Sequence, residues 1–216
     1  MTPSDDLRAK VLAAAASTPS PTRAAWRLRT AVLSGLAALG ALGFFFGKGG
    51  TRRGDRSDAA LVGTAVLWAI VAASVTWLGL KPARSMLGRS RATLLGVLVG
   101  TAPALAATAL LVALAEGPAV DPRMHLACGV LTVAQGVLPL VALAVLRRGG
   151  DPLYPVVTGA SLGVAAGAWS ALMAHLRCSY VGVPHVLLAH VLPVLVLAGV
   201  GAVVGATLLR VRVRGS

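Results

Sequence analysis

Length, composition and charge indicate a protein that lies in lipid. The chain has 216 residues, of which 56% are hydrophobic and 12% are charged, and its mean hydropathy is +0.81. Soluble domains carry about 25% charged residues, so a water-soluble globular fold is excluded. The formal net charge of +13 arises from 20 Lys and Arg residues in small groups between long apolar segments. This spacing excludes a continuous nucleic-acid-binding face and is typical of the loops of a multi-span membrane protein.

The first part of the chain, residues 1–29, is predicted to be a cytoplasmic segment that contains one short helix. Thr2 caps the helix and Asp5 lies three residues later, as in a capping box. We expect the helix to end near residue 16, because Pro19 and Pro21 interrupt the linker that leads to the membrane. The sequence therefore divides into this segment and a transmembrane domain of residues 30–216.

The N-terminal helix carries a narrow apolar stripe. A helix of about 14 residues is marginal in water, so we expect it to fold against a groove on a partner protein. A disordered leader that only stabilises the orientation of the chain is the alternative. The residues assigned to partner binding are Asp5, Asp6, Leu7, Arg8, Val11 and Leu12.

Six apolar segments follow, each of 18 to 24 residues. A helix needs about 20 residues to cross the hydrocarbon of a bilayer. The sequence thus predicts an all-α membrane protein, a bundle of six transmembrane helices. The predicted spans are residues 30–47, 59–80, 93–115, 126–146, 156–176 and 186–209.

The distribution of basic residues predicts that both termini are cytoplasmic. In this orientation the inner segments hold 14 Lys and Arg residues and the outer loops hold 6. Cytoplasmic loops retain positive charge, so we expect a multi-pass protein of the cell inner membrane. The loop of residues 48–58, with four basic residues, is contrary to this pattern.

Small residues recur at four-residue spacing in several spans. Such stripes let helix backbones approach closely in lipid, although a Gly- and Ala-rich composition also produces them by chance. The triple repeat predicts that the fifth span is a central packing helix. The stripes are Gly43/Gly47, Gly96/Gly100, Gly159/Gly163/Gly167 and Gly201/Gly205.

Catalytic signatures are missing from the sequence. There is no phosphate-binding Gly-rich loop, no HExxH motif and no Ser/His/Asp arrangement, so we expect no enzymatic activity. All seven acidic residues fall outside the predicted spans. This disfavours a proton- or cation-coupled carrier, which needs an ionisable group within the membrane.

The two cysteines are predicted to lie at the same, outer end of the bundle. Cys128 is near the start of the fourth span and Cys178 follows the fifth, at depths that differ by about 6 Å. A histidine precedes each by three residues, on the same helix face. Three interpretations remain: small buried thiols, a redox pair that forms a disulfide, or a soft-metal site. The metal site would consist of His125, Cys128, His175 and Cys178, and we expect no other cofactor.

Two polar residues lie deeper in the predicted spans, His190 in the sixth and Gln135 in the fourth. Polar side chains at such positions usually form hydrogen bonds with a neighbouring helix. A role in signal sensing is the alternative.

The chain resembles the NrsF-type membrane anti-sigma factors, most clearly from about residue 124 onward. After the fifth helix the family has a His-Cys-Pro-Glu-like stretch, where this chain has His175-Leu176-Arg177-Cys178-Ser179-Tyr180. The matching residues are Asp5-Asp6-Leu7, Cys128, Leu146-Arg147-Arg148-Gly149, Gly159/Gly163/Gly167, Cys178, Pro193, Gly205 and Leu208-Leu209-Arg210.

The resemblance implies a bacterial six-helix protein whose cytoplasmic N-terminus holds an extracytoplasmic-function sigma factor. No direct contact with nucleic acid is expected. It also implies that Cys128 and Cys178, with His175 beside them, take part in a response to oxidative or metal stress. A small membrane transporter or metal-handling protein, and a structural subunit of a larger membrane complex, are the alternatives.

Overall fold

The computed structural model describes residues 57–80, 90–112, 122–147, 154–180 and 182–209, with isolated positions between residues 32 and 50. Among these residues all regular structure is helical. The helices are α3 (Asp58–Leu80), α4 (Arg91–Val112), α5 (Pro122–Arg147), α6 (Pro155–Arg177), α7 (Val183–Val186), the π-helical turn η1 (Leu187–Val191) and α8 (Leu192–Leu208).

Four of these helices are long and apolar enough to cross a membrane. They are α3, α5, α6 and the continuous run of α7, η1 and α8. The apolar part of α4, Arg91–Ala107, is shorter. The five spans predicted from residue 59 onward agree with helices to within a few residues, so the all-helical fold is confirmed, and four of these helices meet the length and hydropathy of a membrane span.

The predicted total of six spans depends on the first span, residues 30–47, which lies mostly outside the described residues. Its described positions, among them Val32, Leu36 and Gly40, are helical. A Cβ on Gly40 would meet Leu138 of α5 at 2.9 Å, so this segment contacts α5. The predicted N-terminal helix lies entirely outside the described residues.

Local sequence explains where the helices begin. The hydroxyl oxygens of Ser57 and Ser90 each accept a hydrogen bond from the backbone N–H three residues later, at 3.2 Å, and so cap α3 and α4. Proline stands in the first turn of α5, α6 and α7, where its missing N–H costs no helical hydrogen bond.

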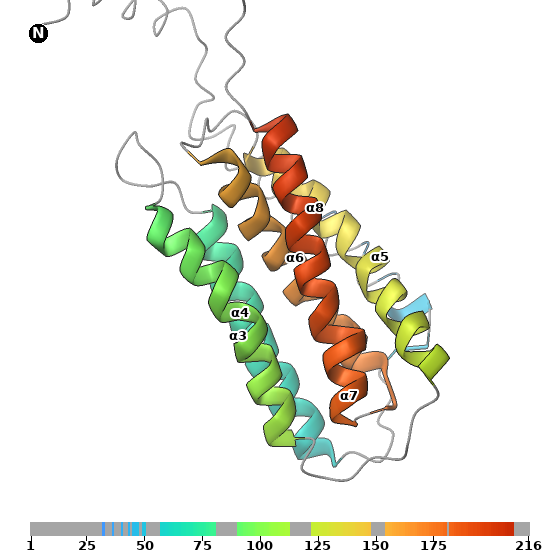
Figure 1. The fold of residues 1–216 in the computed structure, drawn as a ribbon. Helices are drawn as coiled ribbons and strands as arrows, with labels where there is room; N and C mark the ends of the chain where they lie inside the picture. Colours follow the sequence, from blue (N-terminus) through green and yellow to red (C-terminus); the bar gives the residue numbers. More distant parts are fainter. Residues whose placement is uncertain are drawn as a thin grey trace, which may run out of the picture.

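Helix α6 forms the centre of the bundle. The long helices lie side by side in Figure 1, and α6 contacts α3, α4, α5 and α8. Within its apolar window 78% of the residues are buried, against 28% for α3 and 33% for α5. The prediction that the fifth span is the central packing helix is therefore confirmed.

The contact between α6 and α8 is possible because both helices present glycine to each other. A Cβ on Gly159 would meet the Cα of Gly205 at 2.6 Å, and a Cβ on Gly167 would meet the Cα of Val194 at 2.7 Å. On the other side of the contact, a Cβ on Gly201 would overlap the backbone of α6. The two backbones therefore touch directly, which in lipid gains van der Waals contact.

The glycine pair of α4 behaves differently. A Cβ added at Gly96 or Gly100 would meet no other atom within 4 Å among the described residues, and both positions are exposed. This stripe therefore takes no part in the described packing.

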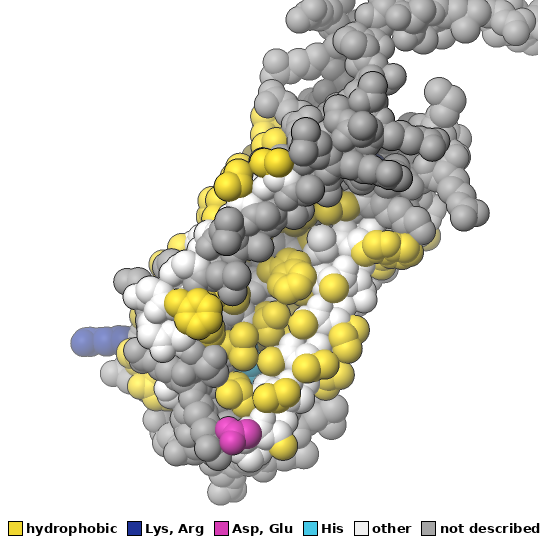
Figure 2. Space-filling model, turned by 180° about the vertical axis from the view of Figure 1, so that it is seen from behind, with side chains coloured by type: hydrophobic (Ala, Val, Ile, Leu, Met, Phe, Trp, Pro, Cys, Tyr) yellow, Lys and Arg dark blue, Asp and Glu magenta, His cyan; other side chains and the backbone are white. Residues whose placement is uncertain are grey.

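Large apolar side chains of the described helices are exposed on the outside of the bundle. Figure 2 shows a face on which most coloured side chains are hydrophobic and few are charged. Exposed fractions reach 72% at Val99 and 70% at Leu126. In a bundle whose interior is already filled by α6, such a surface fits a hydrocarbon solvent.

Candidate functional site

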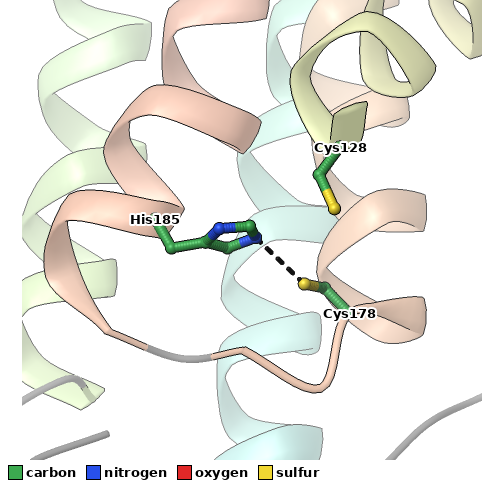
Figure 3. A group of neighbouring side chains, drawn as sticks. All are labelled: Cys128, Cys178 and His185. Atoms are coloured by element: carbon green, nitrogen blue, oxygen red, sulfur yellow. Dashed lines mark hydrogen bonds between the residues drawn. The ribbon is translucent and has the colours of Figure 1, made fainter. Parts of the chain in front are cut away.

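Three elements bring both cysteines and one histidine together at one end of the bundle (Figure 3). Cys128 lies in the second turn of α5, Cys178 follows the last residue of α6, and His185 lies in α7. The three meet because α5 begins at the end of the bundle where α6 ends and α7 begins. Their side chains point toward one another.

A contact between a thiol and an imidazole holds this cluster together. The Sγ of Cys178 lies 3.1 Å from the Nε2 of His185. One ligand atom from each of Cys128, Cys178 and His185 lies within 4.8 Å of the other two. The two cysteines are free of any disulfide, and Cys178 and His185 are 8% and 0% exposed. Two thiols and an imidazole at these distances can form a disulfide, pass a proton or hold a soft metal ion.

A second histidine fixes the ring of His185 from the other side. The Nδ1 atoms of His125 and His185 lie 2.9 Å apart, so one of them donates a hydrogen bond to the other. When His185 carries its proton on Nδ1, it donates to His125 and its Nε2 accepts from the Cys178 thiol. In the reverse arrangement His125 donates and the Nε2–H of His185 faces the sulfur. The tautomer of His185 and the protonation of the Cys178 thiol are therefore coupled.

The four histidines of the chain form one continuous series of ring contacts. Ring centroids are 5.0 Å apart for His125 and His185, 5.3 Å for His185 and His190, and 6.3 Å for His190 and His175. The ring of His175 lies against Trp68, 4.8 Å away. The series therefore runs from α5 through α7, η1 and α6 to α3.

A threonine joins α5 to the turn that follows His185. The hydroxyl of Thr132 donates to the carbonyl oxygens of Cys128, at 2.8 Å, and of Ala189, at 2.9 Å. Ala189 lies in the π-helical turn, where Pro193, four residues later, has no N–H to offer. Thr132 thus donates to a carbonyl group to which Pro193 cannot donate.

The structure brings together most of the predicted site residues. His185, however, lies beside the thiols where His175 was predicted. The two cysteines meet as predicted, and His125 joins them through His185. The Nε2 of His175 instead lies 3.0 Å from the Oγ1 of Thr64 on α3, and His185 is the histidine whose ring reaches the thiols.

Sequence reasoning missed His185 because it fell one residue before the predicted sixth span. A signal for it was present. His185 lies only seven positions after Cys178, and a short loop between antiparallel helices puts the residues on either side at the same depth.

The deeper polar residues have different surroundings. His190 is 1% exposed and lies edge-on to the rings of His175 and His185. The amide nitrogen and oxygen of Gln135 are buried and have no hydrogen-bond partner among the described residues. The predicted helix-to-helix hydrogen bond of Gln135 is therefore not seen in that part of the chain.

The N-terminal residues assigned to partner binding lie outside the described residues. They are Asp5, Asp6, Leu7, Arg8, Val11 and Leu12.

Fold and site together define a multi-span helical membrane protein that carries a thiol–imidazole cluster at one end of its bundle. The family model for NrsF, negative regulator of sigma F, matches residues 12–211, and the chain belongs to that family. Neither the curated proteins nor the solved structures contain a match to this chain. Membership in this family makes the protein a negative regulator of a sigma factor. The family is regulatory rather than catalytic.

Proposed function

We propose that this protein is a membrane-bound anti-sigma factor that sequesters an extracytoplasmic-function sigma factor through residues 1–29 and releases it on a stress signal. The family match over residues 12–211 carries the proposal, because it makes a sigma factor the regulated partner. The membrane-spanning helices support regulation by location: a sigma factor held at the membrane does not reach RNA polymerase.

Orientation determines which end of the protein meets the sigma factor. With 14 basic residues on one side and 6 on the other, both termini are cytoplasmic in our proposal. The first turns of α5 then lie at the outer face, and the cluster of Cys128, Cys178 and His185 receives its signal from outside the cytoplasm.

The sigma-binding segment is proposed to fold as it binds. Its apolar residues Leu7, Val11 and Leu12 are spaced for one face of a helix, and Asp5, Asp6 and Arg8 flank them. The Ser/Thr/Pro-rich linker that follows gives the helix reach from the membrane. The family match begins at residue 12, so of the six assigned binding residues only Leu12 lies within the matched region.

Oxidation of Cys128 and Cys178 to a disulfide is a signal to which the cluster can respond. Hydrogen peroxide oxidises two thiols to a disulfide, taking up two electrons and two protons and leaving as two molecules of water. The new bond would draw Cys128 of α5 against Cys178 at the end of α6. To change the bound fraction from 99:1 to 1:99, the signal has to favour the released state by roughly 5.5 kcal/mol.

Capture from native membranes tests the proposal. Full-length protein is expected to retain one sigma factor during purification, and Leu7→Ala with Leu12→Ala is expected to abolish this retention. The matched control is Leu28→Ala, a leucine in the same segment that we do not assign to binding. Undiminished retention in the double variant, or topology reporters that place residue 1 outside the cytoplasm, would contradict the proposal.

The transporter alternative has less support. Among the described residues the only acidic side chain is Asp58, at the first position of α3, so no carboxylate lies in the middle of a described span.

A further inference from the structure

We infer that Cys128, Cys178 and His185 form a binding site for a thiophilic divalent metal ion of the zinc class, in which His125 orients the ligand ring. The inference rests on the proposed function only in treating this cluster as the place where a signal is received. Metal binding itself can be measured without a sigma factor.

The geometry is close to that of a bound site. Zn–S bonds of about 2.3 Å and Zn–N bonds of about 2.0 Å place tetrahedral donor atoms roughly 3.5 to 3.8 Å apart. In this structure one donor atom from each of the three residues lies within 4.8 Å of the others, and Cys178 Sγ and His185 Nε2 are 3.1 Å apart. A movement of about 1 Å therefore closes the site around an ion.

Charge favours a divalent ion. The reaction M²⁺ + 2 RSH + imidazole → M(RS)₂(imidazole) + 2 H⁺ converts both cysteines to thiolates and leaves a complex with no net charge. A monovalent ion in the same site would leave one negative charge. Because the side chains of Cys178 and His185 are buried, an uncompensated charge here is costly.

The histidine pair selects the required tautomer. A metal bound to Nε2 of His185 needs that atom without a proton, so the proton is on Nδ1. The Nδ1 of His125, 2.9 Å away, is placed to accept that proton in a hydrogen bond. A partner of this kind on the second nitrogen fixes the ring of a metal-bound histidine and typically changes affinity 10- to 100-fold. His125 is accordingly a positioning residue and not a ligand.

The site differs from the four-ligand set that the sequence suggested. The His175 ring lies against Trp68, and its Nε2 lies 3.0 Å from Thr64. The described residues therefore supply three protein ligands, and with these alone a fourth tetrahedral position remains for water or for an outside ligand.

The experiment uses full-length, reduced protein in detergent, purified through a tag without histidine. Zn²⁺ is titrated in competition with a chromophoric chelator, and Co²⁺ serves as a spectroscopic probe because thiolate coordination gives charge-transfer absorption. We expect one ion per chain, release of protons on binding in weakly buffered solution, and charge-transfer bands from two thiolates.

Variants assign the residues. Cys128→Ser, Cys178→Ser and His185→Asn are each expected to weaken Zn²⁺ binding at least 100-fold, and His125→Gln 10- to 100-fold with the Co²⁺ spectrum retained. His175→Gln is the matched control and should leave affinity unchanged. Circular dichroism and gel filtration establish that each variant is folded.

Two results would overturn the inference: wild-type protein that binds no Zn²⁺ or releases no protons, or binding that survives in both folded cysteine variants. Loss of affinity in His175→Gln equal to that in His185→Asn would reject the proposed ligand set. Sigma-factor capture is measured on the same preparations. Sigma-factor capture without metal binding would contradict only the metal site. Metal binding without sigma-factor capture would contradict only the proposed function.

Discussion

The hydroxyl of Thr132 lies 2.9 Å from the carbonyl oxygen of Ala189 and joins α5 to the π-helical turn η1. In that turn the N–H of Leu192 bonds the carbonyl of Leu187, five residues earlier. Pro193 then offers no N–H to Ala189. One side chain of α5 thus donates a hydrogen bond to the backbone of the segment that follows His185, one helical turn away from Cys128.

The first prediction concerns this hydrogen bond. Thr132→Val keeps the shape of the side chain and removes the hydroxyl, which leaves the buried Ala189 carbonyl without this donor. We expect the free energy of unfolding to fall by about 1 to 2 kcal/mol. Thermal or denaturant unfolding of the protein in detergent measures the change.

Thr207→Val is the control for Thr132→Val. The Thr207 hydroxyl is exposed and bonds only carbonyl groups of its own helix, at 2.9 Å for Val203. This variant should change the unfolding free energy by less than about 0.5 kcal/mol. Equal effects of the two substitutions would show that the bond to Ala189 has no special role.

The second prediction concerns the glycine contact between α6 and α8. In Gly163→Ala the new methyl group would overlap the Leu197 carbonyl and approach the Cα of Ala198 to 2.9 Å. The helices have to separate, so we expect a loss of about 1 to 3 kcal/mol and a lower amount of folded protein in membranes. Gly100→Ala on α4, where a Cβ meets nothing within 4 Å among the described residues, should be neutral or slightly stabilising.

The third prediction concerns the bond between α6 and α3. Trp169 Nε1–H donates to Thr76 Oγ1 at 3.0 Å, and that hydroxyl donates to the carbonyl of Ala72 at 2.7 Å. A double-mutant cycle of Trp169→Phe and Thr76→Val should give a coupling energy near 0.6 kcal/mol, which is typical of hydrogen bonds between membrane helices. A coupling energy of zero would mean that the two side chains act independently.

The fourth prediction tests whether the two thiols react as a pair. Treatment with diamide should join Cys128 and Cys178, because their sulfur atoms lie within 4.8 Å and both are thiols. The diazene takes up two electrons and two protons and becomes a hydrazine. Labelling of the unfolded chain with a maleimide polymer should then shift reduced protein by two units and oxidised protein by none.

Single variants complete this test. In Cys178→Ser the remaining thiol should stay available for labelling after the same treatment, and dithiothreitol should restore both sites in wild-type protein. Two labelled sites in oxidised wild-type protein would contradict the pairing. Oxidised dimers on a non-reducing gel would show that the thiols meet between chains instead.

Much of the fold follows from hydrophobic periodicity and length. From residue 59 onward the predicted spans agree with the helices, because in lipid every backbone group has to be satisfied within its own helix. The Gly159/Gly163/Gly167 repeat correctly indicated the central helix. The similar pair Gly96/Gly100 meets no neighbour among the described residues. Spacing alone does not reveal which face of a helix meets another.

The site could be predicted only in part. The shared depth of Cys128 and Cys178 follows from helical rise and short loops, and the thiols do meet. Sequence spacing does not reveal that His185, and not His175, lies beside the thiols, because this depends on how each helix is rotated about its axis. A helix rotation is set by packing: Trp68 and Thr64 contact the ring of His175 on the α3 side of the bundle.

The glycine contact has a mechanical consequence for signalling. Because α6 and α8 touch backbone to backbone, they form one stiff unit, and this unit carries Cys178 at one helix end and His185 in the segment leading into the other. Cys128 is carried by α5, a helix of 26 residues and about 39 Å. We therefore expect closure of the cluster to shift α5 relative to α6 and α8, and Arg147, the last residue of α5, lies at the other end of the bundle from Cys128.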